Sequence, residues 1–126
     1  MKIVVLIARI LLGLIFVVLG LNGFLGFLNM GPMPTGLAGQ FMAALFISHY
    51  YWVVAGLQVI GGALLLVNRF VPLALVLLGP VIVNILCYHA FLNHAGAPLA
   101  IVATVLWLIV FSAKRQYFSG IFVQRA

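Results

Sequence analysis

Four long apolar stretches, separated by short links, occupy most of this 126-residue chain. They cover residues 3–28, 50–67, 70–92 and 97–113. A helix needs about 20 apolar residues to cross about 30 Å of hydrocarbon, and each stretch is close to that length. The pattern therefore predicts an all-α integral membrane four-helix bundle, with residues 1–126 forming a single transmembrane domain.

A shorter apolar segment, residues 37–47, lies between the first and second stretches. Two prolines and two glycines within residues 29–36 end the helix before it, and the segment itself is too short to cross the bilayer. Aromatic side chains, which settle at the level of the lipid headgroups, occur at Phe41, Phe46, Tyr50, Tyr51 and Trp52. We expect a short interfacial or re-entrant helix on the outer side.

The charges of the chain are all positive, because it contains no Asp or Glu. The six basic residues are Lys2, Arg9, Arg69, Lys114, Arg115 and Arg125. The links at residues 29–48 and 93–97 carry no charged residue. Lys and Arg in short loops stay on the cytoplasmic side, so we expect both termini in the cytoplasm and residues 114–126 as a cytoplasmic tail. Anionic headgroups of the lipid bilayer, not nucleic acid, are the expected partners of these cations.

Glycines recur on one side of the first two long stretches, where they predict close helix contacts. Lipid tails are as apolar as leucine, so small residues decide where transmembrane helices approach one another. We expect packing at Gly20, Gly23, Gly61 and Gly62, either within the bundle or against a second copy in a homo-oligomer.

Few polar side chains lie at membrane depth, and such groups are functional candidates because burying them in lipid is costly. They are Asn22, Gln58, Asn84, Tyr88 and His89, which fall in the middle or outer half of their stretches. Helices that turn these faces inward would enclose a small polar pocket below the outer surface. The alternative is a set of interhelical hydrogen bonds that fix helix register. Arg9 has two interpretations. Its long side chain extends to the inner headgroups, or it is buried and has a role inside the bundle.

The cysteine and histidine residues of the chain give little support for redox or metal chemistry. The single cysteine, Cys87, can form no internal disulfide, and no C-x-x-C motif is present. A b-type haem would need two axial ligands from facing helices, and the spacing of His49, His89 and His94 does not require such a pair. We therefore expect neither haem nor a metal site. A proton relay through carboxylates is excluded, since the chain has none.

The order and spacing of several stretches resemble the DoxX family of small bacterial four-span membrane proteins. The matching stretches are Ala8 to Phe16, Gly20 to Phe24, Pro32-Met33-Pro34, Gly56 to Leu65, and Pro80 to Leu86 followed by His89. The resemblance implies a multi-pass protein of the bacterial inner membrane. The family is named for a membrane subunit linked to thiosulfate:quinone oxidoreduction, and most members have no assigned activity. Many relatives carry a glutamate where this chain has Gln58.

Two hypotheses of different classes follow. In the first, the protein is a membrane subunit whose polar pocket holds a lipophilic ligand such as a quinone for a membrane redox partner. A catalytic activity of its own is less favoured than binding alone. Asn22, Gln58, Asn84, Tyr88 and His89 would supply hydrogen bonds to it. In the second, the protein is a non-catalytic scaffold that oligomerises or binds partners through its glycine faces. A channel or transporter is less favoured, because no repeat halves or charged ring are visible.

Overall fold

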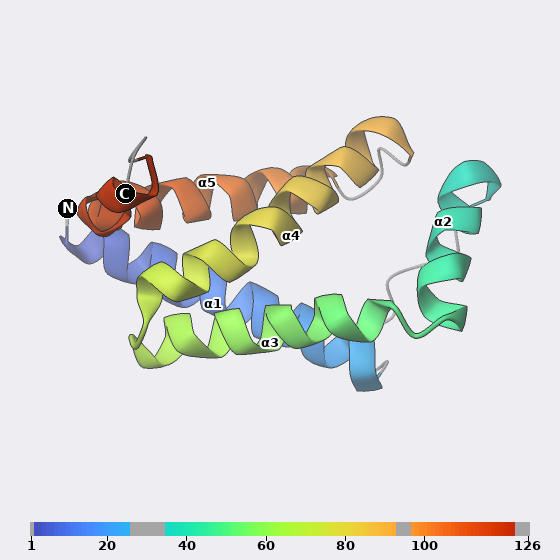
Figure 1. Ribbon diagram of the computed structural model, residues 1–126, viewed down its shortest axis with the longest axis horizontal. Helices are drawn as coiled ribbons and strands as arrows, with labels where there is room; N and C mark the ends of the chain where they lie inside the picture. The colour runs from blue at the N-terminus through green and yellow to red at the C-terminus, as the bar shows by residue number, and fades with distance from the viewer. Residues whose placement is uncertain (1, 26–34, 93–96, 123–126) are drawn as a thin grey trace.

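The computed structural model describes residues 2–25, 35–92 and 97–122, and within these residues every regular element is a helix (Figure 1). The elements are α1 (Lys2–Leu25), α2 (Gly36–Ile47), α3 (Tyr51–Val67), α4 (Val71–Phe91), α5 (Ala97–Lys114) and the 3₁₀ helix η1 (Arg115–Phe122). The prediction of an all-α protein is confirmed. The helices α2 to α5 begin and end within one residue of the predicted segments, while residues 26–28 and 123–126 lie outside the described part.

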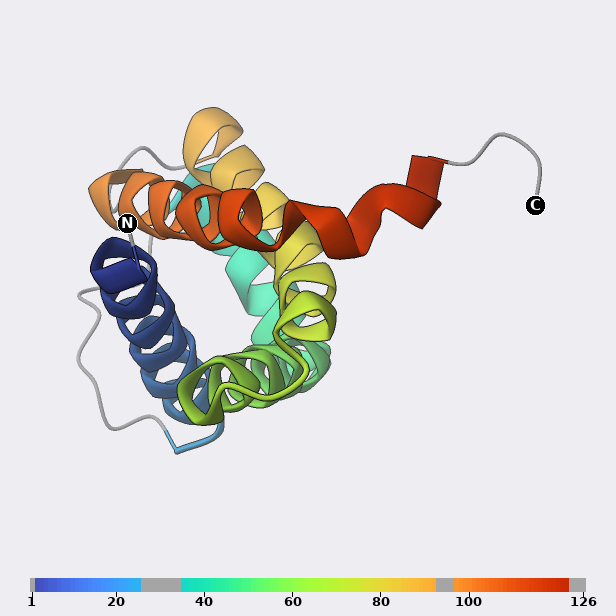
Figure 2. The same cartoon turned by 90° about the vertical axis from the view of Figure 1, so that its left-hand side faces the viewer.

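The helices α1, α3, α4 and α5 lie side by side in a ring, with the most extensive contact between α1 and α3 (Figure 2). The α3–α4 turn is short because Asn68 and Phe70 both take left-handed conformations, with φ of 57° and 51°. The centre of the ring is filled by large side chains with no exposed surface. These are Leu12, Phe16, Leu65, Leu75, Leu78 and Val110.

The outer surface of the ring is as apolar as its core. Side chains such as Leu14, Ile60, Val83 and Val105 are 46%, 54%, 58% and 49% exposed. Water would penalise a continuous apolar surface of this kind, whereas lipid tails accept it. Three segments of the described chain, α1, α4 and Ala97–Ser119, are long and apolar enough to cross a membrane. The helices α2 and α3 meet at an 80° bend, and they form a fourth candidate span if the pair is counted as one broken span. These lengths indicate a multi-pass membrane protein.

Glycines bring the backbones of α1 and α3 into direct contact. A Cβ added at Gly62 would lie 2.7 Å from the carbonyl oxygen of Gly13 and 2.8 Å from the amide nitrogen of Val17. A Cβ at Gly20 would lie 2.8 Å from the carbonyl oxygen of Ala55. Only glycine leaves room for this approach, which maximises the dispersion contacts that hold helices together in lipid. Of the other two predicted packing glycines, Gly61 meets Leu78 of α4 and Gly23 meets Tyr51.

Arg9 belongs to the bundle and does not extend away from it. Its guanidinium donates hydrogen bonds to the carbonyl oxygens of Leu65 and, at 3.4 Å, Leu66, in the last turn of α3. The last carbonyls of a helix carry partial negative charge. In a chain without Asp or Glu, the C-terminus of α3 thus provides the negative pole that this cation contacts. The structure favours the buried role over the side chain that reaches the headgroups.

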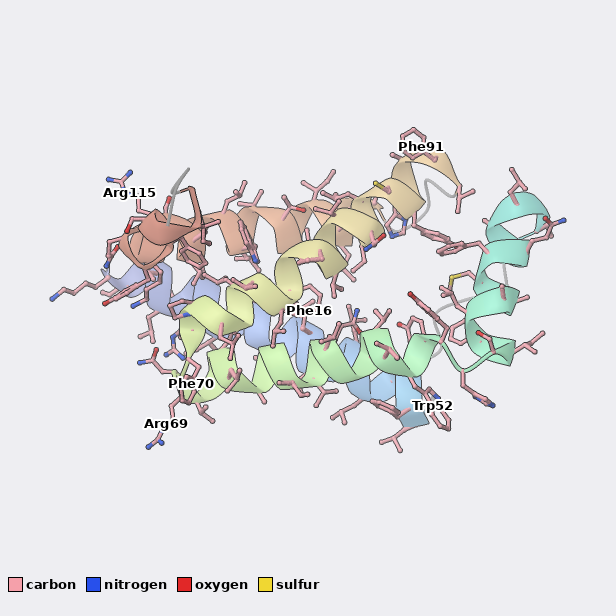
Figure 3. All side chains as sticks on the ribbon, viewed as in Figure 1. Phe16, Trp52, Arg69, Phe70, Phe91 and Arg115 are labelled. Atoms are coloured by element: carbon pink, nitrogen blue, oxygen red, sulfur yellow. The ribbon has the colours of Figure 1, made fainter. Side chains whose placement is uncertain are left out.

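The two ends of the bundle differ in chemistry. Arg69 and Arg115 lie at one end, together with the start of α1, whereas Trp52 and Phe91 lie at the other (Figure 3). At the aromatic end, ring centroids of His49 and Trp52 are 4.7 Å apart. At the basic end, η1 leaves α5 sideways, across the direction of the bundle (Figure 2).

Candidate functional site

Gln58 is the one polar side chain in the buried core of the described residues. It is 3% exposed, and its oxygen Oε1 has no hydrogen-bond partner in the described part of the chain. Gln58 shares a face of α3 with Ala55, Gly62 and Leu65, which are also buried. An amide oxygen buried without a donor costs about 1–3 kcal/mol. The structure therefore contains an unused hydrogen-bond acceptor in the middle of an apolar bundle.

Asn84 lies elsewhere, on an exposed part of α4. Its side-chain Nδ2 donates a hydrogen bond of 2.9 Å to the carbonyl oxygen of Pro80, one turn earlier in the same helix. The buried residues of α4 that contact the core, among them Leu78 and Ile82, occupy a different face. The structure therefore does not bring Asn84 into the bundle centre with Gln58.

Tyr88 and His89 lie at the aromatic end of α4, where both are half-buried. The two rings meet edge to face, with centroids 5.1 Å apart. Tyr88 also packs against Phe41 of α2, at a centroid distance of 5.7 Å, so this ring helps to hold α2 over the aromatic end of the bundle. A ring contact between α2 and α3, Phe46 with Tyr51 at 4.9 Å, supports α2 from the other side.

Asn22 is half-buried near the end of α1, on the helical face that also carries Ile15 and Leu19. Those two residues line a groove of about 320 Å³ between α1 and α5, together with Leu14, Val18 and Leu99. A second groove, of about 210 Å³, lies between α4 and α5 and is lined mainly by apolar side chains with Gly79, Thr104 and Trp107. The polar groups of that groove are already engaged, since Thr104 Oγ1 donates to the carbonyl oxygen of Ala100 and Trp107 Nε1 to that of Leu75.

The five predicted ligand residues thus occupy separate places. Gln58 lies in the core, Asn84 lies on an exposed face, Tyr88 packs against α2 with His89 beside it, and Asn22 lies on the α1 face beside the α1–α5 groove. Both grooves could accept lipid tails, but neither presents an unused polar group. Within the described residues, no three His, Cys, Asp or Glu side chains come close enough to hold a metal ion. Of the five, Gln58 alone combines deep burial with an acceptor that lacks a donor.

Comparison with family models, curated proteins and solved structures finds no match to this chain. The resemblance to the DoxX family therefore stays a prediction from stretches of the sequence.

Proposed function

We propose that this chain is a DoxX-like protein of the bacterial inner membrane with four spans and both termini in the cytoplasm. The basic end of the bundle, with Arg69 and Arg115, would face the cytoplasm according to the positive-inside rule. The fourth span is α3, whose 17 residues extend about 26 Å at 1.5 Å per residue. The 80° bend between α2 and α3 would leave α2 near the plane of the outer headgroups.

Labelling of single cysteines tests this orientation. In a Cys87→Ser background, Ser48→Cys at the α2–α3 bend should react with a membrane-impermeant maleimide in intact spheroplasts. Ser119→Cys in η1 should react only after the membrane is opened. Both positions are exposed, so access alone decides the labelling. The reverse pattern, or labelling of both positions from outside, would contradict the topology.

We further propose that the protein is a membrane subunit that binds a lipophilic ligand of the quinone class at Gln58. The observation that carries this proposal is the buried Oε1 without a donor. A quinol hydroxyl can donate to that oxygen, and the amide nitrogen can donate to a quinone carbonyl, so the side chain suits both redox states. Gln58 is enclosed by membrane-spanning helices, and a ligand that reaches it from the bilayer must be lipid-soluble.

The resemblance adds support at the same position. The DoxX family is named for a subunit linked to quinone reduction, and many of its members carry a glutamate where this chain has Gln58. A glutamine keeps hydrogen-bonding groups there without the ionisable proton. We therefore assign to this chain the binding of the quinone, and to a separate membrane redox partner the electron transfer.

Gln58→Met tests the ligand site, because methionine has a similar shape and no hydrogen-bonding group. Loss of a hydrogen bond worth about 1.4 kcal/mol should reduce the quinone that co-purifies per protein about tenfold, as measured by organic extraction and mass spectrometry. The free energy of unfolding of the ligand-free protein should stay equal or rise, because the variant removes an acceptor that is buried without a donor.

Asn84→Leu serves as the matched control, since it removes an amide of similar depth from an exposed face of α4. This variant should retain the quinone. Equal retention by the wild type and Gln58→Met, or bulk phospholipid as the only extracted lipid, would contradict the ligand site.

A second candidate function is a non-catalytic interaction protein, and the exposed Asn84 favours it. A polar side chain at membrane depth is more stable against a protein surface than against lipid tails. The predicted glycine faces are a poor surface for that contact, because Gly20, Gly61 and Gly62 already meet neighbouring helices within the bundle.

A further inference from the structure

One face of α4 is not covered by the other helices of the described residues. It carries Leu73, Pro80, Asn84, Cys87 and Phe91, all of which are exposed. Leu73 is 50% and Phe91 is 82% exposed. Successive members of this set are seven, four, three and four residues apart, which is the spacing of a coiled-coil seam. We call this set the α4 seam.

Asn84 is the only amide in the α4 seam. It lies seven residues before the end of α4, about 10 Å inside the outer end of the helix. Nδ2 uses one N–H on the carbonyl oxygen of Pro80, and within the described residues the side chain makes no other hydrogen bond. One N–H and the oxygen Oδ1 therefore face the surroundings of the bundle. In hydrocarbon these groups find no water to pair with.

We propose that the α4 seam binds the α4 seam of a second copy of this chain, with the two Asn84 amides hydrogen-bonded to each other. The proposal rests on the membrane placement argued above, because both copies then insert in the same direction. Their symmetry axis is parallel to the membrane normal, and each residue of the seam lies opposite itself. An amide both donates and accepts, so two copies of Asn84 satisfy each other without any further group.

The other residues of the α4 seam also favour a second copy of the chain as its partner. Apolar side chains flank Asn84 on both sides, and a single polar residue in an apolar seam fixes the register of two helices. The small-residue faces of α1 and α3 are already used inside the bundle, where Gly13 and Gly62 contact each other. A different membrane protein would have to present both a donor and an acceptor at the same depth, whereas a second copy does so by symmetry.

Cys87 reports on this contact without any mutation, since it is the single cysteine of the chain, is exposed, and belongs to the seam. Two cysteines form a disulfide only when their Cα atoms come within about 7 Å. Copper phenanthroline with oxygen, applied to the full-length protein in liposomes at high lipid-to-protein ratio, should give a disulfide-linked homodimer. Asn84→Val should slow its formation about threefold to tenfold, as expected for the loss of interhelical hydrogen bonds in lipid.

The control is Cys87→Ser with Val105→Cys, which moves the thiol to a position on α5 that is 49% exposed. This variant should form little dimer, because α5 lies outside the seam. Equal rates for Cys87 and Val105→Cys would show random collisions and overturn the proposal, and so would an unchanged rate in Asn84→Val. The quinone content of Asn84→Val separates the two proposals. Loss of the dimer with the quinone retained supports the dimer through the α4 seam and agrees with a quinone site at Gln58.

Discussion

Gly62→Ala should destabilise the folded protein by about 1–3 kcal/mol or more, the cost of overpacking a tight contact. The new methyl group would lie 2.7 Å from the carbonyl oxygen of Gly13 and 2.8 Å from the amide nitrogen of Val17. Both are backbone atoms, so no side-chain rotation can relieve the clash, and α1 must move away from α3. That movement weakens the largest helix contact of the bundle. Unfolding in mixed micelles with increasing dodecyl sulfate measures the change.

Two neighbouring glycines of α3 provide graded controls. The three atoms nearest to a Cβ at Gly61, at 2.7–3.1 Å, all belong to the Leu78 side chain, which can rotate away, so Gly61→Ala should cost less than Gly62→Ala. In the described part of the chain, no atom outside the backbone of α3 and the two chain neighbours lies within 4 Å of a Cβ at Gly56. Gly56→Ala should therefore leave the stability equal or raise it, because alanine favours a helix more than glycine does. If Gly56→Ala and Gly62→Ala destabilise equally, the described approach of α1 and α3 is wrong.

Arg9→Met should lower the free energy of unfolding by about 1.5–3 kcal/mol, the range for hydrogen bonds to a charged group. The guanidinium contacts the carbonyl oxygens of Leu65 and Leu66, and its charge lies at the negative end of the α3 dipole. Methionine keeps the apolar stem and removes both effects. The same micelle titration gives the value.

Arg9→Lys separates the two interpretations of this residue. Lysine keeps the charge but lacks the planar fork of arginine donors, so its stability should fall between those of the wild type and Arg9→Met. If the side chain at position 9 only extended to the headgroups, lysine would give the same stability as arginine. Wild-type stability in both variants would therefore contradict the contact with α3.

The helices of this protein can be predicted from the sequence because length and apolarity are enough to define them. The bounds of α3 and α5 coincide with the ends of apolar stretches. The short α2 is predicted by the prolines that precede it and by the aromatic residues within and after it. The basic residues also indicate which ends of the helices lie together, and Arg69 and Arg115 do lie at one end of the bundle (Figure 3).

The direction in which each polar side chain points could not be predicted in the same way. In a soluble helix, the polar face marks the outside, but here both faces are apolar, so Gln58 and Asn84 look equivalent in the sequence. The structure separates them: Gln58 is buried in the core, and Asn84 is exposed. The role of Arg9 was hidden for a related reason, because its partners are backbone carbonyls, which no residue type reveals.

Quinone binding at Gln58 is tested most directly by the side-chain amide signal of Gln58 in an NMR spectrum of protein labelled with ¹⁵N-glutamine in nanodiscs. The chain has four glutamines, Gln40, Gln58, Gln116 and Gln124, and the spectrum of Gln58→Met identifies the signal in question. On titration with decylubiquinol, the Gln58 signal should show a saturable shift while the other three stay in place. An unmoved Gln58 signal, or equal shifts of all four, would contradict a quinone site in the core.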